Sequence, residues 1–552
     1  MGKKLILGIL IVVLVFCGCA RQSTKENTPS SNTIPIPPPS ILAPASTPTS
    51  TSAPSVTPVP RVVRPAIRSV DLVAFQSPRN GTWFSTNLDT LPDVDQQYEA
   101  SFNIQDTPVN NRRNGTISPT LLAGYFFLQW DITKDKFQEY ANTVNALFIR
   151  SANSRFVNYP DSTVFDWSQK ASKISTDVVG IIRACNEKGI PVFVQINYSD
   201  FIPGPTSSGI ESLQPSDNLA KIIAYINALK SESLRITGIT FGDEIEDNQG
   251  YGNLQPTLYN DDLIARFIKY ADNIKTEFPE VKIYAFDSYI MASRAQVSRY
   301  FDFFERIRKA EIQVAKVLLD GFVFRESYVY MDDGGKVLDS QLILDDTESL
   351  YRNMPVYRYD VSGTRNPAQD SGYLPLLLAR TKEIFGRELD IGITEYLPAG
   401  AYKVSETNTS KYSDVDFIIH FSDMVGIYAE LGLDYLSKIM FADSLNMHKA
   451  YFDRKGNLGV NFPVHEQLAQ NFMGELLNVE RSIDYDHLKV KVYATRKDKN
   501  YFVMILNKDV GSESVIRVTL PEQLDLTIRL PRRSYVSLLI NERDIVISGI
   551  GN

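Results

Sequence analysis

From about residue 121 to residue 441, the sequence alternates between short apolar runs rich in β-branched side chains and longer amphipathic runs. The apolar runs predict eight strands, at 121–129, 146–149, 192–196, 236–241, 282–286, 316–324, 391–394 and 436–441. The intervening runs predict helices at 134–144, 175–188, 218–229, 262–278, 300–315, 373–385 and 414–431. Alternating strands and helices form a parallel sheet with crossover helices, and eight repeats predict an α/β fold, the (β/α)8 TIM barrel.

The pattern changes on both sides of this predicted barrel, to which we assign residues 117–478. After a last helix at 465–477, short alternating strands are expected at 490–494, 501–507, 514–520, 524–530 and 534–540. They predict an accessory all-β sandwich domain at 479–552. The polar segment 65–116 is expected to contribute further β-strands to this sandwich. A chain of 552 residues is long enough for a barrel and a smaller module.

Residues 1–20 have the layout of a secretory signal peptide. Lys3 and Lys4 precede an apolar run at 5–16, which is followed by Cys-Gly-Cys-Ala. The segment resembles a bacterial lipoprotein signal, in which a small residue precedes the lipidated cysteine, and Gly18 therefore favours Cys19 over Cys17. The alternative is an uncleaved membrane anchor. Both interpretations predict an exported protein, tethered to the cell membrane and facing outward.

The segment 21–64 is predicted to be a disordered linker. Pro, Ser and Thr supply 25 of the 40 residues at 21–60, so the segment lacks the apolar side chains needed for a core. Such a linker would hold a folded module away from the membrane.

Composition and the rarer side chains exclude several classes of function. The net charge of -8 argues against nucleic acid as a partner. Only Cys185 lies in the body of the protein, so no disulfide framework is possible there. The four histidines form no closely spaced pair and have no cysteine cluster beside them, so we expect no metal site.

Two of the predicted strands end in acidic residues. The stretch 238–247 reads Gly-Ile-Thr-Phe-Gly-Asp-Glu-Ile-Glu-Asp, and the stretch 389–396 reads Leu-Asp-Ile-Gly-Ile-Thr-Glu-Tyr, with Glu395 near its end. In a barrel of parallel strands, the carboxyl ends share the rim where βα loops converge and chemistry takes place. Two carboxyl groups at that rim suggest glycoside hydrolysis. Glu246 and Asp247 are interpreted as loop charges rather than catalysts.

From 117 to 540 the order of these pieces resembles the clan A glycoside hydrolases, especially the α-L-arabinofuranosidase-like and endo-glycanase branch with a C-terminal β-sandwich. Ile-Ser-Pro at 117–119 and Leu-Ala-Gly-Tyr-Phe at 122–126 are similar to its first strand. Leu-Phe-Ile-Arg at 147–150 is similar to its second strand, which implies that Arg150 is an active-site arginine. Phe-Gly-Asp-Glu at 241–244 and Ile-Thr-Glu-Tyr at 393–396 imply that Glu244 is the acid/base and Glu395 the nucleophile of a retaining enzyme. The resemblance implies no cofactor.

The sequence departs from the family pattern in two places. The family usually has Asn before the acid/base glutamate, whereas this chain has Asp243, which accepts but does not donate a hydrogen bond when ionised. An ionised Asp243 would also raise the pKa of Glu244, as an acid catalyst requires. The sixth strand ends Phe-Arg-Glu-Ser-Tyr at 324–328, without the histidine that the family often has there. These changes leave the substrate open.

Other residues at the predicted rim are candidate sugar contacts. We expect substrate-binding roles for Asp243, Arg150, Asn197, Tyr198, Tyr289, Tyr328, Tyr396, Trp130 and Trp167. Aromatic faces stack on sugar rings, but the tyrosines and tryptophans serve equally well in a core.

The predicted function is an extracellular, membrane-tethered glycoside hydrolase that acts on a polysaccharide or oligosaccharide. The alternative is a surface lipoprotein with the same fold that binds a glycan without cutting it. A solute-binding lipoprotein of a transporter is a more distant alternative, since such proteins have two α/β lobes. The pair of glutamates favours the enzyme, because a binding protein has no need of two opposed carboxyl groups. The sugar, the linkage, endo or exo cleavage and the oligomeric state are left open by the sequence.

Overall fold

The computed structural model describes most of the chain after residue 67. The described residues are 68–75, 83–91, 97–127, 140–150, 178–196, 215–241, 261–287, 294–328, 344, 373–398, 413–440, 459, 461–483, 489–521, 524–541 and 544–551. The predicted signal peptide and linker, including Cys19, and most of the predicted helix 134–144 lie outside them.

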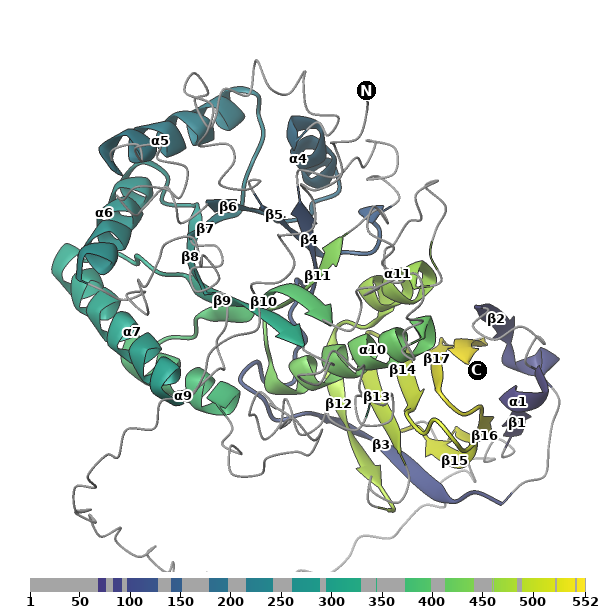
Figure 1. Ribbon diagram of the computed structural model, residues 1–552. Helices are drawn as coiled ribbons and strands as arrows, with labels where there is room; N and C mark the ends of the chain where they lie inside the picture. The colour runs from purple at the N-terminus through teal and green to yellow at the C-terminus, as the bar shows by residue number, and fades with distance from the viewer. Residues whose placement is uncertain are drawn as a thin grey trace, which may run out of the picture. The chain divides into compact units, whose positions relative to one another are not determined.

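Eight parallel strands close into a barrel (Figure 1). In order they are β4 (Leu122–Phe127), β5 (Ala146–Arg150), β6 (Val192–Ile196), β7 (Gly238–Phe241), β8 (Lys282–Asp287), β9 (Gly321–Tyr328), β10 (Asp390–Pro398) and β11 (Tyr435–Met440). Each pairs with the next, and β11 pairs with β4. The predicted TIM barrel is therefore confirmed.

Helices cover the outside of the barrel (Figure 1). They are α4 (Val178–Glu187), α5 (Pro215–Ser231), α6 (Asp261–Glu277), α7 (Arg294–Val314), α9 (Tyr373–Phe385), α10 (Asp414–Leu431) and α11 (Phe462–Asn471). Alternation along each strand divides its side chains between the helices and the interior. On β7, for example, Phe241 packs against Phe267 and Tyr270 of α6. Thr240, one residue earlier, belongs to the interior face.

The sixth barrel strand and the last helix differ from their predicted bounds. The predicted strand 316–324 begins only at Gly321, because the amides of Leu318 and Leu319 donate to the buried Glu311 carboxylate, at 2.9 and 3.2 Å, instead of to a neighbouring strand. The predicted helix 465–477 is wrong in its second half. Helix α11 ends at Asn471, and after Gly474, which has a φ of 85°, the chain continues as a strand.

A ten-stranded mixed sheet forms the second part of the fold, with the order β1-β16-β15-β3-β12-β13-β14-β17-β18-β2. From the C-terminal region come β12 (Glu475–Arg481), β13 (Val490–Lys497), β14 (Asn500–Asn507), β15 (Ser514–Thr519), β16 (Asp525–Leu530), β17 (Ser534–Ile540) and β18 (Ile545–Gly551). From the segment before the barrel come β1 (Arg68–Asp71), β2 (Phe84–Asn87) and β3 (Ala100–Pro108). Two short helical turns, α1 (Leu72–Phe75) and η1 (Leu88–Thr90), follow β1 and β2. The sequence did not predict β12 and β18.

Both faces of the central strands of this sheet are buried. On β13, Val492 and Ala494 belong to a core formed within the sheet, whereas Tyr493 belongs to the core of the barrel and its helices. Successive side chains of a strand point to opposite faces. One face of the sheet therefore contributes to the core within the sheet, and the other face packs against the barrel helices.

Helix α10 lies at this junction, and residues 415–429 are all buried (Figure 1). Asp423 of α10 accepts hydrogen bonds from the Tyr493 hydroxyl at 2.6 Å and from the Lys508 ammonium at 2.5 Å, and the side chains of Asp423 and Lys508 are fully buried. A β-carbon added at Gly426 would overlap the Tyr493 ring. The barrel and the sheet are therefore held together by a close-packed, charge-paired interface.

Candidate active site

Parallel pairing brings the carboxyl ends of all eight barrel strands to one rim. The backbone places Arg150 at the end of β5, Tyr328 at the end of β9, and Glu395 and Tyr396 in the second half of β10. The structure describes only the backbone of these four residues. The backbone therefore places these four predicted site residues at the same end of the barrel.

The other predicted site residues lie outside the described residues. Asp243 and Glu244 follow the last residue of β7, Phe241, by two and three positions in the sequence. Asn197 and Tyr198 directly follow β6, and Tyr289 comes two residues after β8. Trp130 and Trp167 also lie outside the described ranges. The roles of all these residues stay predictions.

Strand β10 is irregular immediately before Glu395. Ile393 pairs with Phe324 of β9, but the next pair is Glu395 with Arg325, so β10 has one residue more than β9 here, at Thr394. The register with β11 shifts at the same place. Such a β-bulge changes the direction of the following side chains, and bulges are common at barrel rims beside active sites.

Aromatic side chains fill the lower part of the barrel interior. The rings of Phe148 and Phe193 stack with centroids 4.7 Å apart, and Tyr284 stacks on Phe193 at 5.0 Å. The Tyr435 ring meets Phe148 edge-on at 5.2 Å. Burial, and next the neighbouring Tyr435, raises the pKa of Tyr284 well above its usual value, so its hydroxyl is a neutral hydrogen-bonding group. This packed layer is the floor beneath the rim.

A hydrogen-bonded pair of polar side chains, Tyr125 and Gln195, lies on the interior face above this floor. The sequence did not predict it. The hydroxyl of Tyr125 on β4 donates to Oε1 of Gln195 on β6 at 2.5 Å, and both side chains are buried. Gln195 pairs in register with Arg150 on β5 and with Thr240 on β7. The signal in the sequence was a single Gln in the apolar run Val-Phe-Val-Gln-Ile, two residues after an inward-facing Phe193.

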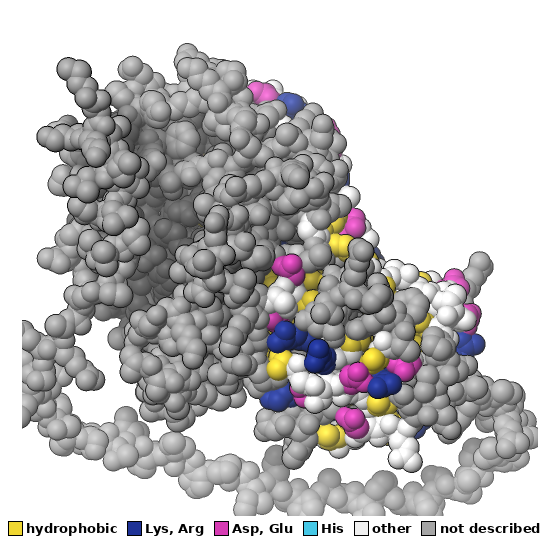
Figure 2. Space-filling view, turned by 45° about the vertical axis from the view of Figure 1, so that its right-hand side comes forward, with side chains coloured by type: hydrophobic (Ala, Val, Ile, Leu, Met, Phe, Trp, Pro, Cys, Tyr) yellow, Lys and Arg dark blue, Asp and Glu magenta, His cyan; other side chains and the backbone are white. Residues whose placement is uncertain are grey.

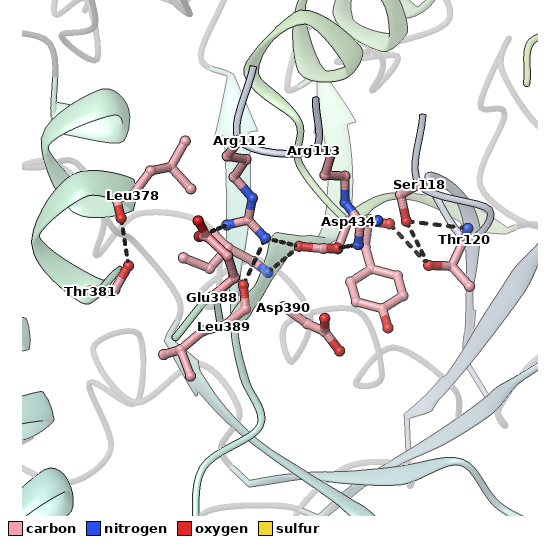
Figure 3. Close-up of polar contacts among 12 residues, drawn as sticks. Arg112, Arg113, Ser118, Thr120, Leu378, Thr381, Glu388, Leu389, Asp390 and Asp434 are labelled. Carbon is pink, nitrogen blue, oxygen red and sulfur yellow. Dashed lines mark hydrogen bonds and ion pairs between the residues drawn. The ribbon is translucent and has the colours of Figure 1, made fainter. Parts of the chain in front are cut away.

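At the opposite end of the barrel, charged side chains serve the fold (Figure 3). Asp434, directly before β11, is 1% exposed and accepts hydrogen bonds from Arg112 at 2.6 Å, from Arg113, and from the Ile391 amide at 2.8 Å. Arg112 also donates to the Leu389 carbonyl at 2.7 Å. Burial raises the pKa of Asp434, against the opposing effect of Arg112. This cluster ties the segment between β3 and β4 to the starts of β10 and β11.

Among the described residues, neither a cysteine nor a group of metal-ligating side chains offers an alternative site. Burial raises the pKa of the Cys185 thiol to about 12, so it is not an active nucleophile. Within the described ranges, no group of three His, Cys, Asp or Glu side chains could hold a metal ion.

Among the helices that the structure describes, none is both long and apolar enough to cross a membrane. In the space-filling view, acidic and basic side chains are interspersed over the described surface (Figure 2).

Solved structures share this fold at low sequence identity. A family 44 xyloglucanase from Paenibacillus polymyxa has 10% identity and a TM-score of 0.52, over 83% of this chain and 100% of that one. A family 51 α-L-arabinofuranosidase from Bifidobacterium longum has 9% identity and a TM-score of 0.53, over 82% and 100%. A family 44 endoglucanase from Clostridium thermocellum has 13% identity and a TM-score of 0.51, over 82% and 100%.

No protein-family model matches the chain, and no curated protein matches it in sequence. At such identities the similarity shows a shared fold. The resemblance predicted from the sequence is confirmed at that level, for the barrel and its accessory β-sheet together.

Proposed function

We propose that this protein is a glycoside hydrolase of the retaining type, with Glu244 as acid/base and Glu395 as nucleophile. The observation that carries the proposal is the position of β7 and β10 as fourth and seventh strands of one closed parallel barrel. This order supports the placement of both acidic stretches at the same rim. The shared fold with a xyloglucanase, an endoglucanase and an α-L-arabinofuranosidase supports the same chemistry.

The bulge in β10 supports the assignment of Glu395. Ile391 and Ile393 both belong to the helix-facing core, so unbroken alternation would assign Glu395 to that face as well. The extra residue at Thr394 shifts the alternation by one position, which supports an inward-facing Glu395. A carboxylate needed only for solubility or capping would not require this irregularity.

In the proposed reaction, protonated Glu244 gives its proton to the glycosidic oxygen while ionised Glu395 attacks the anomeric carbon. The bond to the leaving group breaks as the glycosyl ester to Glu395 forms. Glu244, now a carboxylate, then takes a proton from water, which displaces Glu395 and releases the sugar. This route requires the two carboxyl groups to be about 5 to 5.5 Å apart, against roughly 6.5 to 9.5 Å for inversion.

The candidate contacts at the rim would bind the sugar and tune these carboxyl groups. Arg150, at the end of β5, would keep Glu395 ionised through a charge-assisted hydrogen bond. Asp243 would accept a hydrogen bond from a sugar hydroxyl. Asn197, Tyr198, Tyr289, Tyr328, Tyr396, Trp130 and Trp167 are proposed to contact the same substrate.

Release of reducing sugar from a panel of plant, microbial and exopolysaccharide glycans tests the proposal. The wild type is expected to cleave at least one of them, and Glu244→Gln and Glu395→Gln are each expected to abolish cleavage. Glu246→Gln, two residues from Glu244, is the matched control and should retain activity. If the wild type binds one glycan without cleaving it, and all variants bind equally well, the chain is a glycan-binding surface protein instead.

We also propose that the chain is lipidated at Cys19 and faces outward from the cell membrane, with residues 21–64 as the spacer. The order of a charged start, an apolar run and a small residue before Cys19 supports this. Metabolic labelling with a radioactive fatty acid should mark the wild type but not Cys19→Ala. Equal labelling of a Cys17→Ala control would confirm the choice of cysteine, and loss of label only in Cys17→Ala would overturn it.

A further inference from the structure

We propose that the outer face of the accessory sheet, around Tyr98 and Arg517, binds a neutral polysaccharide chain. The choice of a glycan as the ligand rests on the function proposed above, but binding at this face does not require the barrel to cleave. The starting point is Tyr98, two residues before β3, which is 46% exposed. Of the aromatic side chains that the structure describes, it is the most exposed.

The strands beside Tyr98 bury one face and leave the other partly exposed. On β15, Ile516 and Val518 belong to the core within the sheet, whereas the alternate residues Arg517 and Thr519 are partly exposed. The neighbouring β16 and β3 follow the same alternation. This part of the sheet therefore differs from β13, where the second face packs against the barrel helices.

Arg517 is held in place beside the Tyr98 ring. Its guanidinium donates to Oδ2 of Asp525 at 2.6 Å, and the Thr519 hydroxyl donates to Oδ1 of the same carboxylate at 2.6 Å. Cζ of Arg517 lies 5.6 Å from the centroid of the Tyr98 ring, and the two side chains are also hydrogen-bonded to each other. Side chains that are already ordered lose little conformational entropy when a ligand binds, so this pair is pre-organised for binding.

The charges on this face are paired. Arg517 forms an ion pair with Asp525 at 2.6 Å. Arg529 of β16 donates to Glu513 at 2.6 Å and to Asp71 at 3.2 Å. With two arginines against three carboxylates, the face has no excess of positive charge to attract nucleic acid or an anionic lipid surface. It therefore suits an uncharged ligand.

Polar groups continue from Arg517 and Thr519 across the sheet. Their register neighbours on β3 are Ser101 and Asn103, which are partly and fully exposed. A sugar chain has C–H faces that stack on an aromatic ring, and hydroxyl groups that exchange hydrogen bonds with guanidinium, amide and hydroxyl groups. An exposed ring beside such groups on an open sheet matches this combination in an extended polymer.

A protein partner fits the same face less well. Protein interfaces have a buried apolar centre, usually built from several aromatic or aliphatic side chains. Among the described residues, the other large apolar side chains with high exposure are Ile312 on α7 and Val317 after it, which belong to the barrel. Tyr98 thus has no second exposed apolar residue beside it in the described part of the sheet.

Affinity electrophoresis tests the inference. The Glu395→Gln protein, in which cleavage should be abolished, is run in gels that each contain one glycan of the panel above, neutral or anionic. At least one neutral polysaccharide is expected to retard it. Adding Tyr98→Ala should raise the apparent Kd for that glycan about 10-fold, because a stacking contact is lost, whereas Tyr98→Trp should keep the affinity.

Ile312→Ala is the matched control, because it also removes an exposed apolar side chain but lies on a barrel helix, and it should bind like its parent. Arg517→Leu is a second variant on the proposed face and should also weaken binding. Thermal unfolding of each variant checks that the fold is retained, and Tyr98→Ala should change Tm little because the side chain is exposed.

Three results would overturn the inference: no retardation by any glycan of the panel, retardation by anionic glycans alone, or equal affinity of Tyr98→Ala and its parent. Self-association that depends on Tyr98 in light scattering would assign the face to a second copy of the chain instead. If the wild type cleaves nothing but Tyr98-dependent binding persists, the inference stands and the proposed hydrolase function falls. Cleavage with no dependence of binding on Tyr98 has the opposite meaning.

Discussion

Strand β10 carries an acidic residue near each end, and the two have different surroundings. Asp390 is the first residue of the strand, and its carboxylate accepts hydrogen bonds from Lys282 and from the Tyr284 hydroxyl, each at 2.6 Å. Glu395 lies beyond a bulge, at the end where the βα loops converge. In the sequence each is a single acid at one end of the short run Ile-Gly-Ile-Thr at 391–394, Asp390 before it and Glu395 after it.

The comparison extends to the whole barrel. At the amino end, Asp434 and Glu311 are almost completely buried, and each accepts hydrogen bonds from both arginine and backbone amides. Such saturated carboxylates hold strands and loops in place and have no capacity for chemistry. An acid at the start of a barrel strand therefore indicates stability, and an acid at its end indicates a site.

The largest expected effect is at the carboxyl end. Glu395→Gln should lower kcat by at least about 10³-fold, because it removes the attacking carboxylate, while Tm changes little. Initial rates and thermal unfolding of the same preparations check this. A loss of Tm comparable to that of the amino-end variants below would mean that Glu395 is structural and would end the distinction between the two ends.

Asp434→Ala should have the opposite profile. Removing the acceptor of Arg112, Arg113 and the Ile391 amide leaves buried donors without a partner, so we expect the free energy of unfolding to fall by about 3 to 5 kcal/mol. The kcat of the folded fraction should be unchanged. Denaturant unfolding measures the first quantity. Glu388→Gln is the control, because Glu388 is partly exposed and lies 3.8 Å from Arg112, and it should cost little.

Asp390→Asn sharpens the comparison within one strand. The variant removes the charge that faces Lys282 but keeps an oxygen acceptor for Tyr284, and both charged partners are partly exposed. We expect a loss of about 1 to 2 kcal/mol of stability and an unchanged kcat. A large fall in kcat without loss of Tm would show that the floor of the barrel, and not only its rim, takes part in catalysis.

The smallest effect concerns the pH dependence of folding. His465 of α11 is buried against the Phe421 ring, with centroids 4.2 Å apart, and its Nε2 is 3.3 Å from Lys438. Burial, and next Lys438, lowers its pKa well below the usual value. A depressed pKa in the folded state means that stability is present above the unfolded pKa of about 6.5 and is lost as pH falls through it.

We therefore expect the wild type to lose about 1 kcal/mol between roughly pH 7.5 and 5.5 through this residue, and His465→Gln to lose that much less over the same interval. Denaturant unfolding at the two pH values measures the difference. Equal losses of the free energy of unfolding in the two proteins would mean that groups other than His465 cause the loss of stability at low pH. The measurement also separates the pH dependence of folding from that of catalysis at the rim.

Much of the fold could be predicted from the sequence. The strand 192–196 and the helices 373–385 and 414–431 have the predicted bounds, because strong periodicity and end signals such as Ser413 and Gly432 mark them. Strand β12 was missed because its first residues continue the apolar spacing of α11. Strand β18 was missed because Gly549 and Gly551 weaken its pattern.

The candidate site could be predicted in outline only. Acids at the ends of two strands pointed to the rim, but nothing local predicted the bond between Tyr125 and Gln195, which are 70 residues apart in the chain. The sequence also could not show the bulge at Thr394, since an extra residue in a strand is defined only by its partners on β9 and β11.

The sequence by itself determined the alternation of strands and helices and the residue types at the strand ends. These follow from periodicity and local turn chemistry, which act over a few residues. The tertiary structure alone decided which strands from before the barrel pair with which C-terminal strands, that α10 is buried on all sides, and which acids are paired. Those features depend on contacts between segments far apart in the chain, where burial and hydrogen-bond partners, rather than residue type, set what a carboxylate does.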